Sequence, residues 1–177
     1  MKSIKYKLEF FSEWHCGSGL SKGADVDALV VKDSQGLPFV PGKTIKGLLR
    51  EQVALLTDLR GTEKDLKQQF DETFGVFKSQ EGTIFCSNAE LPEQSCISKD
   101  LATFLYRSLS FTAINDDGVA DNHSLRKIEA VVPCTMEGTI EGISDDLYDF
   151  VKDGLALIKR MGTHRSRGLG RCKFTII

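Results

Sequence analysis

The chain reads GLPFVPGKTIKGLLR from Gly36 to Arg50, a turn and a short extended run that Pro41-Gly42 separates from a helix. At about 100° per residue, one side of this helix carries Lys43, Lys46, Gly47 and Arg50, and the opposite side carries Ile45, Leu48, Leu49, Leu55 and Leu56. A helix N-terminus presents unpaired N–H groups and a partial positive charge. The stretch therefore predicts an amphipathic helix over about 44–58 whose first turns can hold phosphate.

The 177 residues are enough for one domain with a buried core. A hydrophobic content of 41% and a charged content of 27% are ordinary for a soluble globular protein. No apolar run approaches the roughly 18–20 residues of a membrane span, and the alternating start at 1–7 lacks the apolar core of a signal peptide. The five cysteines form no CxxC pair, which argues against a zinc knuckle or a disulfide framework. We expect a single domain over 1–177, in the cytoplasm and with no membrane partner.

Charge is distributed unevenly along the chain. The formal net charge of −2 argues against a protein that is basic over its whole surface. From Gly154 to Ile177 there are six Lys or Arg residues and no acid, while acids gather at 63–72, 90–93, 116–121 and 137–153. Because local charge decides where a polyanion is gripped, the C-terminal segment is a candidate for such a grip.

Hydrophobic periodicity predicts an α+β fold. Alternating or apolar runs predict strands at 3–12, 25–32, 82–89, 127–143 (broken at Pro133) and 171–177. Helical patterns lie at about 44–58, 62–73 and 99–109, and a last helix is expected from an N-cap at Ser144 to a C-cap at Gly162. The coarse order β-α-β-β-α-β, with inserts, predicts a ferredoxin-like (RRM-like) core. The polar stretch 112–127 predicts a long excursion from that core.

A glycine- and arginine-rich loop, GTHRSRGLGR, runs from Gly162 to Arg171 before the final strand. Its glycines at 162, 168 and 170 would let the backbone approach a ligand closely, and its arginines can form paired hydrogen bonds with phosphates. It lacks the GKS or GKT ending of a phosphate-binding Walker loop. It also follows a helix and precedes a strand, which is the wrong order for the dinucleotide-binding fingerprint. On its own, the pattern fits a phosphate-binding loop or a solvated turn.

Four segments of the chain share a pattern with one protein family. Gly36–Arg50 resembles Gly-x-Pro-x-Ile-Pro-Gly-Ser-Ser-Leu-Lys-Gly-x-x-Arg, and Trp14–Gly19 resembles Leu-His-x-Gly-Ser-Gly. Leu125–Glu129 is similar to the segment that leaves the family's "thumb" loop, and Gly168–Gly170 is similar to its C-terminal glycine-rich loop. These motifs belong to the RAMP superfamily of CRISPR proteins and occur here in the expected order. The resemblance covers most of the chain, from residue 14 to residue 171.

Within that superfamily, the chain best resembles the backbone subunit of type III effector complexes. The resemblance implies an RRM-like fold with lateral inserts and a thumb insertion near 112–127. It also implies binding of CRISPR guide RNA, polymerisation of copies of the chain into a filament along that guide, and assembly with other effector subunits. Such subunits often cleave the complementary target RNA with the help of a metal ion.

The resemblance also implies where cleavage would occur. The family's cleaving aspartate lies in a Gly-Ala-x-Asp segment before the second extended run, which here offers Asp25 and Asp27. The apolar run and Lys-Asp pair that follow select Asp27, and Asp25 would point the same way in an extended segment and could substitute. Asp27 could hold a hydrated Mg²⁺ or another divalent cation together with an RNA phosphate. Without the resemblance, both acids would read as solvated loop residues.

RNA binding is expected from several parts of the chain. The residues assigned to it are His15, Ser18, Lys43, Lys46, Arg50, Arg126, Lys127, His164, Arg165, Arg167 and Arg171. Arg126 and Lys127 would help to place the thumb across the guide. Lys43-Thr44 departs from the family's pair of small hydroxyl residues, but Thr44 can still cap the helix and Lys43 adds positive charge.

Three alternatives stay open. The chain could be a non-catalytic scaffold subunit of the same complex. It could instead be a guide-RNA-processing endonuclease of the same superfamily, in which His15 or His164 would act as general acid or base. The chain is short for a two-domain processing enzyme. An RRM-like RNA binder unrelated to these complexes is the third possibility.

Overall fold

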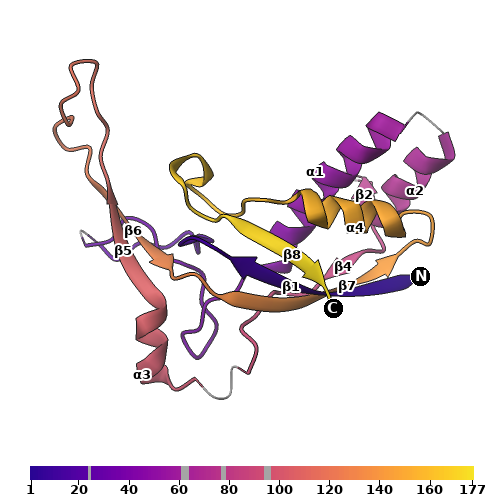
Figure 1. Cartoon of the computed structure of the whole chain (residues 1–177), viewed down its shortest axis with the longest axis horizontal. Helices are drawn as coiled ribbons and strands as arrows, with labels where there is room; N and C mark the ends of the chain where they lie inside the picture. The colour runs from indigo at the N-terminus through magenta and orange to yellow at the C-terminus, as the bar shows by residue number, and fades with distance from the viewer. Residues whose placement is uncertain (24, 61–63, 77–78, 94–96) are drawn as a thin grey trace.

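The computed structural model describes residues 1–23, 25–60, 64–76, 79–93 and 97–177. Its centre is a four-stranded antiparallel sheet in the order β4-β7-β1-β8 (Figure 1). The strands are β1 (Lys2–Phe10), β4 (Phe85–Cys86), β7 (Thr135–Ile143) and β8 (Cys172–Ile176). Helices α1 (Gly42–Arg60) and α2 (Lys64–Phe74) lie between β1 and β4 in sequence, and α4 (Tyr148–Leu157) lies between β7 and β8. The predicted mixture of helices and strands is confirmed.

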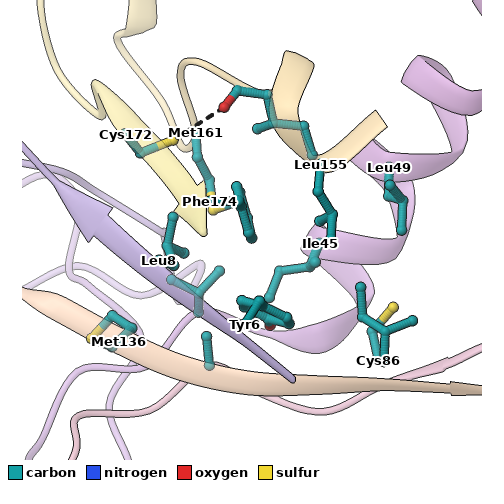
Figure 2. Close-up of a cluster of buried hydrophobic side chains, with 14 of the residues drawn as sticks. Tyr6, Leu8, Ile45, Leu49, Cys86, Met136, Leu155, Met161, Cys172 and Phe174 are labelled. Carbon is teal, nitrogen blue, oxygen red and sulfur yellow. Dashed lines mark hydrogen bonds between the residues drawn. The ribbon is translucent and has the colours of Figure 1, made fainter. Parts of the chain in front are cut away.

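The hydrophobic core lies between this sheet and the helices on one of its faces (Figure 1). Alternate residues of β1, from Ile4 to Phe10, are buried, and those between them are exposed. Figure 2 shows the side chains of Leu8, Ile45 of α1 and Leu155 of α4 gathered in one cluster. This alternation is typical of a half-buried strand. The expected strand at 3–12 is confirmed, with bounds shifted by one to two residues.

A two-stranded hairpin extends away from the sheet (Figure 1). Its strands are β5 (Tyr106–Phe111) and β6 (Arg126–Val131), paired antiparallel from Tyr106–Val131 to Phe111–Arg126. The residues between them include a turn in which the Asn115 Oδ1 accepts the N–H groups of Asp117 and Val119. The predicted polar excursion at 112–127 is therefore the outer part of this hairpin.

The remaining elements are short. They comprise α3 (Lys99–Ala102) and the 3-10 turn η2 (Thr103–Leu105) before the hairpin, the small ribbon of β2 (Gly75–Val76) with β3 (Gln80–Glu81), and the 3-10 turn η3 (Arg165–Arg167) before β8.

No helix in the described parts of the chain has the length and apolar content that crossing a membrane requires.

The basic helix begins earlier than predicted and is capped differently. α1 starts at Gly42, so Thr44 lies within its first turn and does not cap it. The N–H of Gly42 instead donates to Asn88 Oδ1 at 3.0 Å. A Cβ on Gly42 would collide with the backbone around Cys86, so only glycine fits beside β4. Leu55, placed on the apolar side of the helix by its periodicity, is 51% exposed.

The last helix is shorter than predicted. α4 runs only from Tyr148 to Leu157, without a side-chain cap at its start, and Ile158 is already extended. Met161 remains in the core, but its N–H donates to the carbonyl of Gly170 at 2.8 Å, which pairs this segment with the approach to β8. Gly162 has a φ of 87° but is not the helix C-cap. Tertiary pairing thus ends the helix although the apolar spacing continues.

Three other segments differ from their predictions. The expected helix at 99–109 is helical only in α3 and η2, because Tyr106–Phe111 pairs with β6 over a long sequence separation. The expected strand at 82–89 has regular pairing only at Phe85–Cys86. The segment at 25–32 forms isolated bridges, Lys22–Val26, Gly17–Val30 and Ala28–Ile128, without becoming a continuous strand.

Candidate nucleic-acid interface

Asp27 lies against the start of strand β6 in the hairpin. Its N–H donates to the carbonyl of Lys127 at 2.8 Å, and the Lys127 N–H donates to Asp27 Oδ2 at 2.7 Å. Arg126 Nη1 is 3.9 Å from Asp27 Oδ1, and the Asp27 side chain is 46% exposed. Residues that are about a hundred positions apart, each assigned to the site separately, are therefore neighbours. Together they form a fixed carboxylate that solvent can reach, held by a backbone N–H and flanked by the guanidinium of Arg126.

Asp25 is placed differently from Asp27. The N–H of Lys22 donates to the carbonyl of Val26 at 2.8 Å, and the N–H of Asp25 donates to the carbonyl of Lys22 at 3.2 Å. Asp25 therefore lies in a tight turn and not in an extended segment. The expectation that both acids point the same way assumed an extended segment, and that assumption is wrong at Asp25. Asp25 is exposed near the end of this turn.

The site fits only a metal ion that is shared with a ligand. Among the described residues, no group of three or more His, Cys, Asp or Glu side chains could enclose a cation. Mg²⁺, however, keeps several of its waters and is commonly held by one or two carboxylates together with substrate phosphates. In the part of the chain that the structure describes, the group beside Asp27 Oδ1 is the Arg126 guanidinium at 3.9 Å, beyond hydrogen-bond distance, so this oxygen is available to such an ion. The donor set fits a hydrated divalent cation bound jointly with phosphate.

His15 is buried and not on the surface of the site. It is 2% exposed, and its Nδ1 lies 2.6 Å from the carbonyl oxygen of Glu129. A carbonyl only accepts, so Nδ1 carries a proton and donates this hydrogen bond. A Cβ on Gly17 would lie 3.1 Å from Nε2. The carbonyl of His15 accepts the N–H of Thr163 at 3.0 Å, which joins it to the glycine-rich loop.

Ser18 organises the loop that precedes Asp27. Its hydroxyl donates to the carbonyl of Leu29 at 3.0 Å and accepts the N–H of Leu20 at 3.2 Å. The hydroxyl thus uses both its donor and an acceptor site on backbone groups of this chain. Ser18 thus fixes the loop between His15 and the Asp27 segment, and its side chain is half-buried.

The glycine-rich loop, residues 162–171, packs against the end of β5. The imidazole of His164 stacks on the ring of Phe111, with centroids 4.9 Å apart and planes 1° from parallel. The guanidinium of Arg167 lies 5.5 Å from the centroid of the same ring. Desolvation, then Arg167 and His15, lower the pKa of His164 below its ordinary value. Arg165 is exposed, and its carbonyl accepts a hydrogen bond from Arg160 Nη1 at 2.6 Å.

Two glycines of this loop serve contacts within the chain. A Cβ on Gly162 would collide with the carbonyl of His15, and one on Gly170 would collide with that of Met161. Gly168, with a φ of 92°, faces open space. The expectation that all three glycines bring the backbone close to a ligand therefore applies only to Gly168. Arg171 is exposed, and its guanidinium lies 6.0 Å from the ring centroid of Phe11.

The basic residues of α1 do not share one surface hollow. Lys43 is exposed and lines a groove of about 770 Å³ beside Phe39, Phe85 and Asn88. Lys46 and Arg50 line a separate hollow of about 310 Å³ next to β2 and β3. Lys46 Nζ donates to the carbonyl of Ile84 at 3.1 Å, and the guanidinium of Arg50 lies 5.8 Å from the ring centroid of Phe70.

Three residues that organise the site were not predicted from the sequence. Asn88 caps α1, Phe111 stacks on His164, and Glu129 accepts the hydrogen bond of His15. Asn88 and Glu129 act on residues more than 40 positions away, which no local pattern reveals. Phe111 could have been found if residues 106–111 had been assigned to a strand.

A family model described as the RAMP superfamily matches residues 7–173. The chain is also 26% identical, over 187 residues, to the CRISPR system Cms endoribonuclease Csm3 of Enterococcus italicus, with 96% of this chain and 87% of that protein covered.

Two solved structures share the fold. One is a cryo-EM structure of the type III-B Cmr-beta bound to cognate target RNA, in which the matching chain has a TM-score of 0.73 and 11% identity. The other is the apo state of Cmr-beta, with a TM-score of 0.71 and 10% identity. In both, the match covers 99% of this chain and 97% of the other chain.

Proposed function

The chain belongs to the RAMP superfamily, and we propose that it is the RNA-binding backbone subunit of a type III CRISPR effector complex. The observation that carries this proposal is the match of the superfamily model to residues 7–173, nearly the whole chain. The relative in Enterococcus italicus, an endoribonuclease of a CRISPR system, supports the same role. The subunit acts in the cytoplasm with guide RNA, target RNA, further copies of itself and other effector subunits.

The proposed role includes a ferredoxin-like, RRM-like core. The order β4-β7-β1-β8, with α1 between β1 and β4 and α4 between β7 and β8, supports it. The β5–β6 hairpin is the thumb of this domain. Its outer segment begins beside the glycine-rich loop, where Phe111 at the end of β5 stacks on His164.

Guide RNA is held through its phosphates, which gives a grip that does not depend on sequence. Exposed arginines of the glycine-rich loop supply one part of this grip, and Lys43, Lys46 and Arg50 on α1 supply another. Arg126 and Lys127 bind phosphate at the start of β6 in the thumb. Sequence specificity comes from base pairing between guide and target.

The target strand is cleaved next to Asp27. Asp27 presents one oxygen to solvent while the Lys127 N–H holds the other, so the carboxylate has a fixed direction. A divalent cation bound there would neutralise charge that develops on the scissile phosphate or activate the attacking hydroxyl. Arg126 and Lys127 bind the RNA backbone beside this carboxylate. Attack by the RNA 2′-hydroxyl would break the bond from phosphorus to O5′ and leave a cyclic phosphate and a 5′-hydroxyl.

Cleavage by a reconstituted complex tests this proposal. The complex is assembled with guide RNA, and a labelled complementary RNA is added with Mg²⁺ or with a chelator. Asp27→Ala should abolish cleavage while RNA binding is retained, and Asp25→Ala should retain most of the activity because Asp25 lies in a separate turn. Full activity of Asp27→Ala would exclude Asp27 as the cleaving residue, and no metal-dependent activity in the wild type would identify the chain as a scaffold.

The guide-processing alternative is tested separately. Cleavage of precursor RNA by the isolated chain without metal, if it is lost in His15→Ala, would support a processing endonuclease. The burial of His15 and the hydrogen bond of its Nδ1 to Glu129 do not favour this reading.

A further inference from the structure

Glu129 of β6 joins several segments of the candidate site. Its Oε2 accepts the N–H of Val30 at 3.0 Å, and its Oε1 accepts a hydrogen bond from Lys32 Nζ at 2.7 Å. The Glu129 side chain is only 16% exposed. Its backbone N–H donates to the carbonyl of Ala28 at 2.9 Å, and its carbonyl accepts from His15 Nδ1. One residue therefore holds the segment that follows Asp27 and also holds the His15 ring through Nδ1.

The carboxylate of Glu129 completes an irregular ladder. The segment 27–30 runs parallel to β6, with Ala28 bridged to Ile128. Asp27 and Lys127 form the first contact, and Ala28 and Glu129 form the second. At Val30, which is 2% exposed, the partner of the N–H is the Glu129 side chain and not a backbone carbonyl of β6. Without that carboxylate, a buried N–H would lose its acceptor, which is costly.

Lys32 gives the same carboxylate a second anchor. Its Nζ lies 3.9 Å from the ring centroid of Tyr106, on the strand that pairs with β6. The Tyr106 hydroxyl in turn donates to the carbonyl of Gly36 at 2.6 Å. The segment from Asp27 to Gly36 is thus fastened to both strands of the hairpin, with Glu129 at the centre.

We propose that Glu129 is a positioning residue for Asp27: its carboxylate fixes residues 27–32 on β6 and so fixes the direction of the Asp27 carboxylate. The inference rests on the proposed cleavage of target RNA. Displacement of a catalytic group by about 1 Å can reduce a rate by about 100-fold. Glu129 does not need to touch RNA to have such an effect.

Three variants separate the contacts of this carboxylate. Glu129→Ala removes the acceptors of both Val30 and Lys32. Glu129→Gln keeps an oxygen for the Val30 N–H but offers Lys32 no negative charge. Lys32→Met removes the ion pair and leaves Glu129 free to accept from Val30, so it is the matched control.

The experiment uses the assembled complex with guide RNA and a complementary target. Single-turnover cleavage is measured over a range of target concentrations, and hydrogen exchange is measured on the same complexes. Glu129→Ala should lower the rate at saturation by about 10- to 100-fold, with half-saturation changed less than about twofold. Exchange should rise at the amides of 27–31 and stay unchanged in β1. Glu129→Gln and Lys32→Met should keep most of the wild-type cleavage rate and most of the protection from exchange at 27–31.

The outcomes distinguish this proposal from the proposed function. Wild-type cleavage rates in Glu129→Ala would overturn the positioning role. So would equal losses in Glu129→Ala and Lys32→Met, or unchanged exchange at 27–31. If the wild-type complex does not cleave, the proposed cleavage is wrong, and the exchange data alone decide whether Glu129 holds this segment.

Discussion

At the scale of single residues, two glycines of the same loop have opposite surroundings. Gly162 and Gly168 have φ values of 87° and 92°, so both occupy the region that disfavours side chains. A Cβ on Gly162 would collide with the backbone of His15, whereas one on Gly168 would meet nothing within 4 Å. Alanine substitution at each position lowers the free energy of unfolding, and the difference between the two losses therefore measures the packing of the loop against residue 15.

Gly162→Ala should reduce the free energy of unfolding by roughly 2–4 kcal/mol, because backbone strain and a collision add. Gly168→Ala should cost roughly 1–2 kcal/mol, because only the strain applies. Equilibrium denaturation in urea measures both values. Equal losses in the two variants would mean that the loop does not pack on His15 as described.

Single residues also mark the limit of what the sequence could predict. Asp27 was assigned by its place in a family motif, but its contacts with Arg126 and Lys127 join positions about a hundred residues apart. No local pattern contains such a pairing. The burial of His15 was missed for the same reason, since its partner is the carbonyl of Glu129.

At the scale of elements, sequence periodicity located the elements better than it located their ends. The alternation in β1 and the amphipathic pattern of α1 were sufficient to locate these two elements, because each element buries one face against the core. The end of α4 and the identity of 106–111 depended on pairing with β8 and β6, which local propensity does not contain. The start of α1 depended on a cap from a distant residue.

That cap gives a prediction for α1. Asn88→Ala removes the acceptor for the Gly42 N–H and should destabilise the protein by about 1 kcal/mol. Asn122→Ala, at an exposed position of the hairpin, is the control and should change stability by less than about 0.5 kcal/mol. Thermal unfolding of both variants checks the difference. Equal stability of the two would assign the start of the helix to packing alone.

At the scale of the whole molecule, the basic residues lie in two areas with different neighbours. α1 carries Lys46 and Arg50 beside β2 and β3, and the glycine-rich loop carries its arginines beside the hairpin. If one guide RNA crosses both areas, removal of charge from either area must weaken its binding. The opposite face of the sheet displays Lys7, which is exposed on β1 away from the helices.

Salt dependence of guide binding tests whether both areas lie on one RNA path. For single-stranded RNA, each lost phosphate contact should reduce the slope of log K against log salt by about 0.7. Lys46→Gln with Arg50→Gln, and Arg165→Gln with Arg167→Gln, should each reduce it by about 1.4, whereas Lys7→Gln should leave it unchanged. A loss confined to the loop pair would restrict the guide to the hairpin side and remove α1 from the interface.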